Sequence, residues 1–245
     1  MFIPYFYFMI YPRVKFNIDH KLDIDVIANF IDKKIGDFDF GQDRIISEHP
    51  KLEKAKLLSS NKKLSFVEEY VKEYYHKHAN EIETATEKMQ ALWQEIEELY
   101  YTEIYRLFGG LDFYKPDLIS AYVSITKCGV IGDDQKSFQI WYNTMGEPTE
   151  VKRHVAHEVL HFYYYAYLDK KGMKKILQDW DTAEIFNVVI LNLPQFIKLT
   201  GKKEEGYKIH QNKLRFYKDL WVKSGELDKY LSSIQGSPPS PQLPS

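Results

Sequence analysis

A stretch without proline or glycine runs from Ser65 to Phe108 and constrains the fold of this chain more than any other feature. Apolar side chains recur along it at helical spacing, as Val67 and Val71 illustrate, and this pattern is typical of an amphipathic helix. It predicts one very long helix, or two helices with a break near residues 78–80, and the glycine pair at 109–110 is expected to end it. Such a helix either backs the core or offers a surface to a partner.

The rest of the chain alternates between strand patterns and helix patterns. The apolar start is expected to be a buried β-strand that runs into residues 13–19, where Val14 and Phe16 alternate with polar residues. Residues 118–128 and 137–143 are rich in β-branched and aromatic side chains, and the sequence GDD between them predicts a hairpin turn. Further helices are expected at about residues 22–36, 148–169, 173–179, 181–192 and 203–232.

Composition excludes several classes of protein. Of the 245 residues, 44% are apolar and 28% are charged, and the formal net charge is -2 without a long basic block. These values predict a globular protein that binds neither nucleic acid nor a membrane.

The apolar start lacks the basic segment and the cleavage site of a signal peptide, and the single cysteine, Cys128, cannot form an internal disulfide. The cytoplasm is the expected location, and the sequence leaves the oligomeric state open.

The segment HVAHEVLH, residues 154–161, contains an HExxH motif inside an expected helix. Its residues are His157, Glu158 and His161. Four-residue spacing on a helix places the two imidazoles on one face, one turn apart, where both can bind one Zn²⁺ ion. Glu158 lies about 100° round the helix, within reach of a water molecule on the metal. The motif therefore predicts that the two histidines bind zinc and that Glu158 is the general base of a hydrolytic reaction.

Zinc needs a third protein ligand, and a carboxylate from a later helix is the expected one. The long form of the motif, HExxHxxGxxH, is absent, because Tyr164 stands where that form requires glycine. Among the acids that follow, Glu184 is the preferred ligand and Asp181, one turn earlier on the same face, is the alternative. Asp181 and Asn187, one turn later, are also candidates to orient a ligand histidine through a hydrogen bond.

This combination resembles the gluzincin branch of the zinc metallopeptidases, and KRHVAHEVLH followed by EIFNVVILNLP is more loosely similar to the ImmA/IrrE-type peptidases. The resemblance covers about residues 118–195. It implies that the strand before the motif binds the substrate backbone, with Gln139 and Trp141 as the residues that touch substrate. It also implies a downstream tyrosine or histidine that stabilises the oxyanion of the reaction, for which the segment 204–217 offers Tyr207, His210 and Tyr217, with Tyr207 and His210 preferred.

Together these patterns predict an α+β fold with a zincin-like core, made of a small antiparallel sheet, an active-site helix and a glutamate helix, with additional long helices. The expected divisions are an N-terminal strand and helical region at 1–110, a zincin-like catalytic domain at 111–235 and a disordered tail at 236–245. The expected function is that of a zinc-dependent peptidase acting on a peptide or protein substrate. The alternative is a non-catalytic binding or regulatory protein whose metal site is structural or vestigial.

Overall fold

The computed structural model of the protein describes residues 11–35, 38–132 and 134–236. Their contacts group into two compact units. The sheet unit consists of Pro12–Glu95 and Pro116–Val155, and the helical unit contains Tyr11, Ile96–Lys115 and the described residues from Ala156 onward. The domain boundaries expected from the sequence stay a prediction, because this grouping does not test which part folds on its own. The expected strand at 1–10 and nearly all of the expected tail lie outside the described residues.

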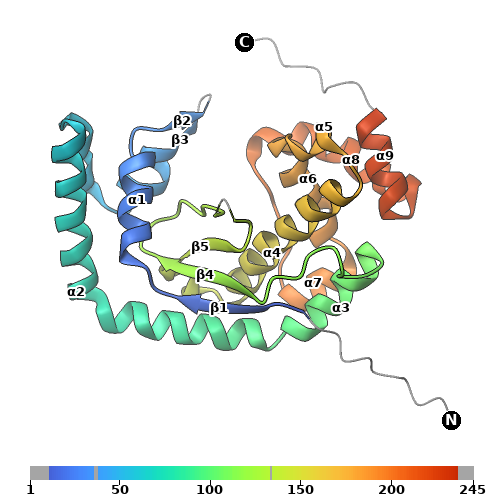
Figure 1. The fold of residues 1–245 in the computed structure, drawn as a ribbon, viewed down its shortest axis with the longest axis horizontal. Coiled ribbons are helices and arrows are strands. Elements are labelled where there is room, and N and C mark those ends of the chain that lie inside the picture. Colours follow the sequence, from blue (N-terminus) through green and yellow to red (C-terminus); the bar gives the residue numbers. More distant parts are fainter. Residues whose placement is uncertain (1–10, 36–37, 133, 237–245) are drawn as a thin grey trace. The chain divides into compact units, whose positions relative to one another are not determined.

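A three-stranded sheet forms the centre of the sheet unit. Its strands are β1 (Arg13–Asn17), β4 (Leu118–Ser124) and β5 (Ser137–Trp141), with β4 in the middle, and both neighbouring pairs are parallel (Figure 1). The prediction of an antiparallel sheet is therefore wrong, while the prediction of mixed helix and sheet is confirmed. Val14 and Phe16 are buried on β1, as the alternating pattern indicates.

The predicted hairpin between the second and third strands is wrong for a local reason. The chain does reverse direction just before β5, but the antiparallel partner of β5 across this turn is the short segment at 130–132, whereas β4 pairs with β5 in parallel. The main-chain N–H of Gln139 donates to the carbonyl of Val130 at 3.0 Å, and that of Gly132 donates to the carbonyl of Ser137 at 2.8 Å. The turn residues thus act as expected, but a local pattern does not specify which upstream residues pair across the turn.

Helix α1 (His20–Phe30) begins at Asp19, whose carboxylate accepts a hydrogen bond from the main-chain N–H of Leu22 at 3.1 Å. This is the usual way in which an aspartate starts a helix, because it satisfies a free N–H of the first turn. The helix ends before residue 36, the end that the sequence predicts, and Gly36 itself lies outside the described residues.

A buried carboxylate on α1 connects several elements of the sheet unit. Asp23 accepts hydrogen bonds from the hydroxyls of Tyr75 at 2.7 Å and Ser124 at 2.6 Å. It also accepts from the main-chain N–H of Ile125 at 3.0 Å and from the side-chain amide of Gln139 at 3.1 Å. Burial raises the pKa of Asp23, and these hydrogen bonds oppose that effect. The four donors join α1, α2, the end of β4 and β5 at one point.

Helix α2 (Ser60–Gln94) is long, as predicted, and bends at His78, where φ is −111° and ψ is 15° (Figure 1). The break expected near residues 78–80 is therefore confirmed. The prediction that the helix then continues to Phe108 is wrong, because Ile96 is not helical (φ −121°, ψ −10°) and a separate helix begins at Glu97.

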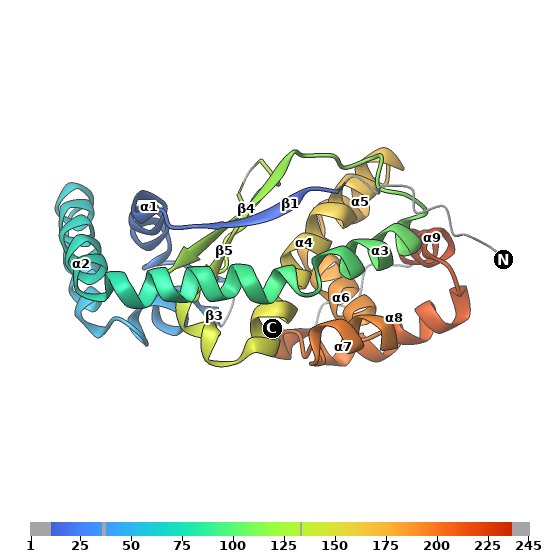
Figure 2. The ribbon, with the colours of Figure 1, turned by 90° about the horizontal axis from the view of Figure 1, so that it is seen from below.

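Beyond the bend, α2 runs beside the outer edge of β1 (Figure 2). The Gln90 amide donates to the carbonyl of Val14 at 3.1 Å and accepts from the N–H of Phe16 at 3.1 Å. One side chain thus satisfies two main-chain groups at that edge.

The other elements of the sheet unit are short. They are β2 (Lys34–Ile35), β3 (Phe38–Asp39), the π-helix η1 (Gly41–Ile46) and the 3₁₀ helices η2 (Pro50–Leu57) and η3 (Tyr142–Gly146).

Helix α4 (Pro148–Lys170) contributes its first residues to the sheet unit and its remainder to the helical unit. The other helices of the helical unit are α3 (Glu97–Phe108), α5 (Lys174–Leu177), α6 (Trp180–Leu191), α7 (Pro194–Thr200), the 3₁₀ helix η4 (Lys208–His210), α8 (Gln211–Ser224) and α9 (Leu227–Gly236). Ten residues of α6, from Thr182 to Leu191, are buried, so this helix forms the core of the unit. Among the described residues, no helix has the length and apolar character needed to cross a membrane.

The predicted last helix at 203–232 is wrong in two places. Gly225 adopts a left-handed conformation with φ 66° and separates α8 from α9. The chain at its predicted start is not helical, because residues 203–207 form a loop that leads into η4. This segment is a part of the candidate site described below.

Candidate metal centre

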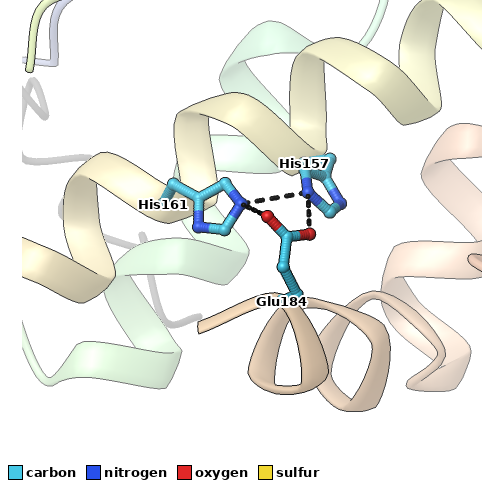
Figure 3. A group of neighbouring side chains, drawn as sticks. All are labelled: His157, His161 and Glu184. Carbon is cyan, nitrogen blue, oxygen red and sulfur yellow. Dashed lines mark hydrogen bonds and ion pairs between the residues drawn. The ribbon is translucent and has the colours of Figure 1, made fainter. Parts of the chain in front are cut away.

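Helix α4 places the two motif histidines on one face, as their spacing predicts. The helix begins with a proline, which suits the first helical position, and has Glu150 in its first turn, where a negative charge is favourable. His157 and His161 project from successive turns toward the same point in the helical unit (Figure 3). Their Nε2 atoms lie 3.0 Å apart. Two imidazole nitrogens at this distance must share a proton or a cation, because their lone pairs would otherwise face one another.

The side chain of Glu184, which belongs to α6, extends toward the two histidine rings (Figure 3). That helix starts at Asp179, which accepts hydrogen bonds from the N–H of Thr182 at 3.3 Å and from its hydroxyl at 2.6 Å. Glu184 Oε2 lies 3.2 Å from Nε2 of His157, and Oε1 lies 3.3 Å from Nε2 of His161. The side chains of the three residues are 8%, 13% and 2% exposed, in the order Glu184, His157, His161.

These separations match the geometry of a zinc site. Tetrahedral ligands at about 2.0–2.1 Å from Zn²⁺ lie roughly 3.3–3.4 Å from one another. Here the two Nε2 atoms lie 3.0 Å apart, and a different oxygen of Glu184 approaches each of them, at 3.2 and 3.3 Å. With one ligand atom taken from each residue, all three atoms lie within 4.8 Å of one another, and the group could hold a metal ion. Two imidazoles and one carboxylate are also a donor set that zinc accepts. The residues present therefore fit the ion that the motif predicts.

The electrostatics of the cluster favour a cation. Burial by itself lowers the pKa of His157, but the hydrogen bonds and negative charges of Glu184 and Glu204 outweigh it and raise the pKa well above its ordinary value. Burial by itself raises the pKa of Glu184, but its contacts with the two histidines keep the pKa below the ordinary value. Burial and the charge of His157 lower the pKa of His161.

Asn187 also belongs to this centre. Its side-chain amide donates to the main-chain carbonyl of His157 at 2.9 Å. The sequence predicts that Asn187 orients a ligand histidine, and the structure does bring it to one, although through the backbone and not through the imidazole ring. The bond links α6 to α4 at the turn that carries the first ligand.

The sequence analysis missed Glu204. This residue lies in the loop between α7 and η4, its side chain is buried, and its Oε2 lies 3.4 Å from Nδ1 of His157. Two signals in the sequence mark the segment as a loop rather than a helix, namely the glycines at 201 and 206 that flank it. A glutamate in a short loop between two glycines was the signal that could have identified Glu204 as a site residue.

Glu158 is buried on α4 next to His157 in the sequence, at the position of the predicted general base. The ring of Tyr165 stacks on that of His161, with centroids 5.7 Å apart and an angle of 10° between the planes. Burial raises the pKa of Tyr165 to about 12, and the charges of Glu184 and Glu158 add to the effect. Glu158 and Glu184 therefore both act electrostatically on one aromatic side chain that covers the second histidine.

Asp181 is not a member of the three-residue cluster. Its carboxylate instead contacts Nε2 of His210 at 3.1 Å and the ammonium of Lys213 at 2.8 Å. The ring of His210 is buried and lies 5.7 Å from that of Tyr207, and both rings pack against Trp180. Tyr207 and His210 thus lie together, as a pair held by Asp181 and Trp180, and their role at the oxyanion stays a prediction.

The two residues predicted to touch substrate lie in the sheet unit. Gln139 is buried, its side chain donates to Asp23, and its main-chain N–H donates to Val130. The outer edge of β5 is therefore paired with the chain's own residues at that position. Trp141 lines a cavity of about 510 Å³ together with Arg153. A substrate contact from either residue stays a prediction, and Trp141 has the more accessible side chain of the two.

Comparison of the chain with protein-family models, with curated proteins and with solved structures gave no match.

Proposed function

We propose that the protein is a zinc-dependent peptidase in which His157, His161 and Glu184 hold the ion. The observation that carries this proposal is the approach of the three side chains: the two Nε2 atoms lie 3.0 Å apart, and the two oxygens of Glu184 lie 3.2 Å from His157 Nε2 and 3.3 Å from His161 Nε2, separations typical of neighbouring ligands around zinc. Three protein ligands are also the number that catalytic zinc sites use, since the fourth position serves water or substrate. The resemblance of the motif to gluzincins supports the same assignment.

Zinc, when bound, would polarise a substrate carbonyl and lower the pKa of a water molecule. Glu158 then has the role of the general base, because it follows the first ligand on the same helix and its carboxylate accepts a proton from the attacking water. It then gives that proton to the amide nitrogen as the C–N bond breaks, so that the products are a carboxylic acid and an amine. Asn187 holds the turn of α4 that carries His157, and so keeps the ligand and the base in a fixed relation.

A single substitution tests the catalytic part of the proposal. Glu158→Gln is expected to keep about one zinc ion per chain, measured by atomic absorption, and to abolish cleavage of a fluorogenic peptide library that the unaltered protein cleaves. Asp169→Asn, at an exposed position near the end of the same helix, is the matched control and should leave cleavage unchanged. Loss of zinc in Glu158→Gln, or equal cleavage by both variants, would contradict the role given to Glu158.

One observation favours a second candidate, a protein whose metal site is structural. The ligand side chains are only 2–13% exposed, and enclosed sites of this kind are common where a metal only stabilises a fold. In that case the unaltered protein binds zinc, cleaves nothing across the peptide library, and unfolds when a chelator removes the ion. Zinc content and cleavage measured on one preparation separate the two candidates.

A further inference from the structure

The geometry points to Glu204 as a positioning residue that orients His157 for metal binding. This inference rests on the proposed metal centre and adds to it a residue outside the HExxH helix and the glutamate helix. Glu204 does not face the ion position. It faces the opposite nitrogen of the same imidazole ring, and it is held there by the chain around it.

The two nitrogens of His157 have different surroundings. Nε2 faces the other ligands, at 3.0 Å from His161 and 3.2 Å from Glu184. Nδ1 faces Glu204 Oε2 at 3.4 Å. A ring that binds a metal through Nε2 carries its proton on Nδ1, and a carboxylate is the strongest acceptor that a protein can place there. The contact is longer than a charge-assisted hydrogen bond by roughly half an ångström, a distance that a small side-chain rotation closes.

The backbone of Glu204 is fixed by a single side chain, that of Asn192, the residue directly after α6. The Asn192 amide donates to the main-chain carbonyl of Glu204 at 2.7 Å, and the Asn192 carbonyl oxygen accepts from its main-chain N–H at 3.0 Å. Asn192 also donates to the carbonyl of Val188 at 2.8 Å. The loop residue is therefore tied on both sides to the same helix that carries Glu184.

The carboxylate of Glu204 is oriented as well. The main-chain N–H of Gly206 donates to Oε1 at 3.3 Å, which directs the other oxygen toward His157. Gly206 has φ +68°, and a Cβ atom there would lie 2.6 Å from Cγ2 of Val188. Only glycine fits this position without movement of α6, so the local sequence is suited to this orientation of the acid. A buried acid clamped at its backbone and at one oxygen has the features of a residue that orients a metal ligand.

The predicted orienting residues do not fill this role. Asp181 contacts His210 and Lys213 instead, and Asn187 bonds to the main chain of His157 rather than to its ring. Residues that orient a metal-binding histidine contribute roughly 10–100-fold to metal affinity. That range sets the effect expected at Glu204.

The test is zinc affinity, measured by competition with a chromogenic chelator. Glu204→Gln is the informative variant, because the N–H of Gly206 keeps an oxygen at the first position and so places the new amide nitrogen against Nδ1, where it cannot accept a proton. We expect zinc to bind about 10–100-fold more weakly to Glu204→Gln than to the unaltered protein. Glu205→Gln, at the exposed neighbouring position, is the matched control and should bind zinc normally. Equal affinity in both variants would overturn the inference.

A second measurement needs no variant. Nitrogen-15 NMR of the zinc-loaded protein should find the proton of the His157 ring on Nδ1 and the metal-bound nitrogen at Nε2, and the reverse assignment would overturn the inference. In Glu204→Gln the Nδ1 proton signal should shift, whereas a purely structural role of Glu204 would leave it in place. If the unaltered protein binds no zinc, the proposed function fails. If it binds zinc and only the Glu204 effects are missing, the proposed function stands and this inference alone fails.

Discussion

The Nε2 atoms of His157 and His161 face one another at 3.0 Å, and Glu184 lies within 3.3 Å of both. A bound ion would therefore stabilise the folded chain, because only the folded state brings the three ligands together. At a free zinc concentration of about 100 times the dissociation constant, the free energy of unfolding should rise by roughly 2.7 kcal/mol. Thermal unfolding with added zinc or with a chelator measures this change. Magnesium at the same concentration is the control ion, and an equal shift with both ions would contradict a zinc site.

Two acids in the first turns of α6 allow a direct comparison. Glu184→Gln should weaken zinc binding by more than about 100-fold, because it removes a ligand rather than a residue that orients one. Asp181→Asn, one turn earlier, should leave zinc affinity unchanged, since its carboxylate contacts His210 and Lys213. Isothermal titration of both variants with zinc tests the difference. A larger loss in Asp181→Asn would reassign the third ligand to the alternative predicted from the sequence.

The hydrogen bonds around Asp23 predict a large effect on stability far from the metal ligands in the sequence. Asp23→Asn replaces one acceptor oxygen by a donor, so that two of the four surrounding donors lose their acceptor. We expect a loss of about 2 kcal/mol in the free energy of unfolding, measured in urea. Asp25→Asn, at an exposed position on the same helix, should change it very little. Similar values for the two variants would contradict the role of Asp23.

A buried histidine in the sheet unit predicts a pH dependence. His49 Nε2 lies 2.7 Å from the carbonyl of Ile125, which can only accept, so Nδ1 accepts from the hydroxyl of Tyr70 at 2.9 Å. Burial lowers the pKa of His49 below 6.5, its ordinary value, and the charge of His78 lowers it further, against the opposing effects of the Ile125 carbonyl and Glu48. The unfolded chain therefore binds a proton that the folded chain does not. Stability from this group is complete above about pH 6.5 and is lost as the pH falls through the folded pKa.

Urea unfolding of the unaltered protein and of His49→Gln, at pH 5 and at pH 7.5, measures this contribution. Glutamine can donate to the same carbonyl and accept from the same hydroxyl, but it does not titrate. The unaltered protein should lose more stability at pH 5 than the variant does. If both lose the same amount, other groups carry the acid sensitivity.

Gly206 gives a prediction for the loop that holds Glu204. Gly206→Ala combines a left-handed backbone, which costs an alanine about 1 kcal/mol, with a close contact to Val188. Zinc affinity and thermal stability should both fall. Gly172→Ala is the matched control, because it has a similar φ of +66° and an added Cβ meets nothing within 4 Å. It should lose stability through the backbone alone and keep its zinc affinity.

Local patterns in the sequence were sufficient for many of the helices and for most of the centre. The four-residue spacing of His157 and His161 and the helical register of Glu184 follow from the period of an α-helix, which depends on neighbours in the sequence. The bend at His78 and the end of α3 at Gly109 follow from local residue preferences in the same way.

Pairing between distant segments could not be predicted. The pairing of β1 with β4 depends on contacts across about a hundred residues. The alternation within each strand is the same for either direction, so it does not show that β4 and β5 are parallel. Glu204 was missed for a related reason. Its segment contains enough lysine and glutamate to resemble the start of a helix, and only the contact with Asn192, twelve residues away, fixes it as a loop.

The bonds of Asn192 to Val188 and Glu204 have a consequence for engineering. That asparagine fastens the loop to α6, so Glu184 and Glu204 belong to one structural unit. The two histidines belong to another, the helix α4. A designer who wishes to graft this centre onto another scaffold needs to reproduce only two modules and the spacing between them. Each module is a continuous stretch of chain, residues 156–165 and residues 180–206, so the transplant requires no assembly of scattered side chains.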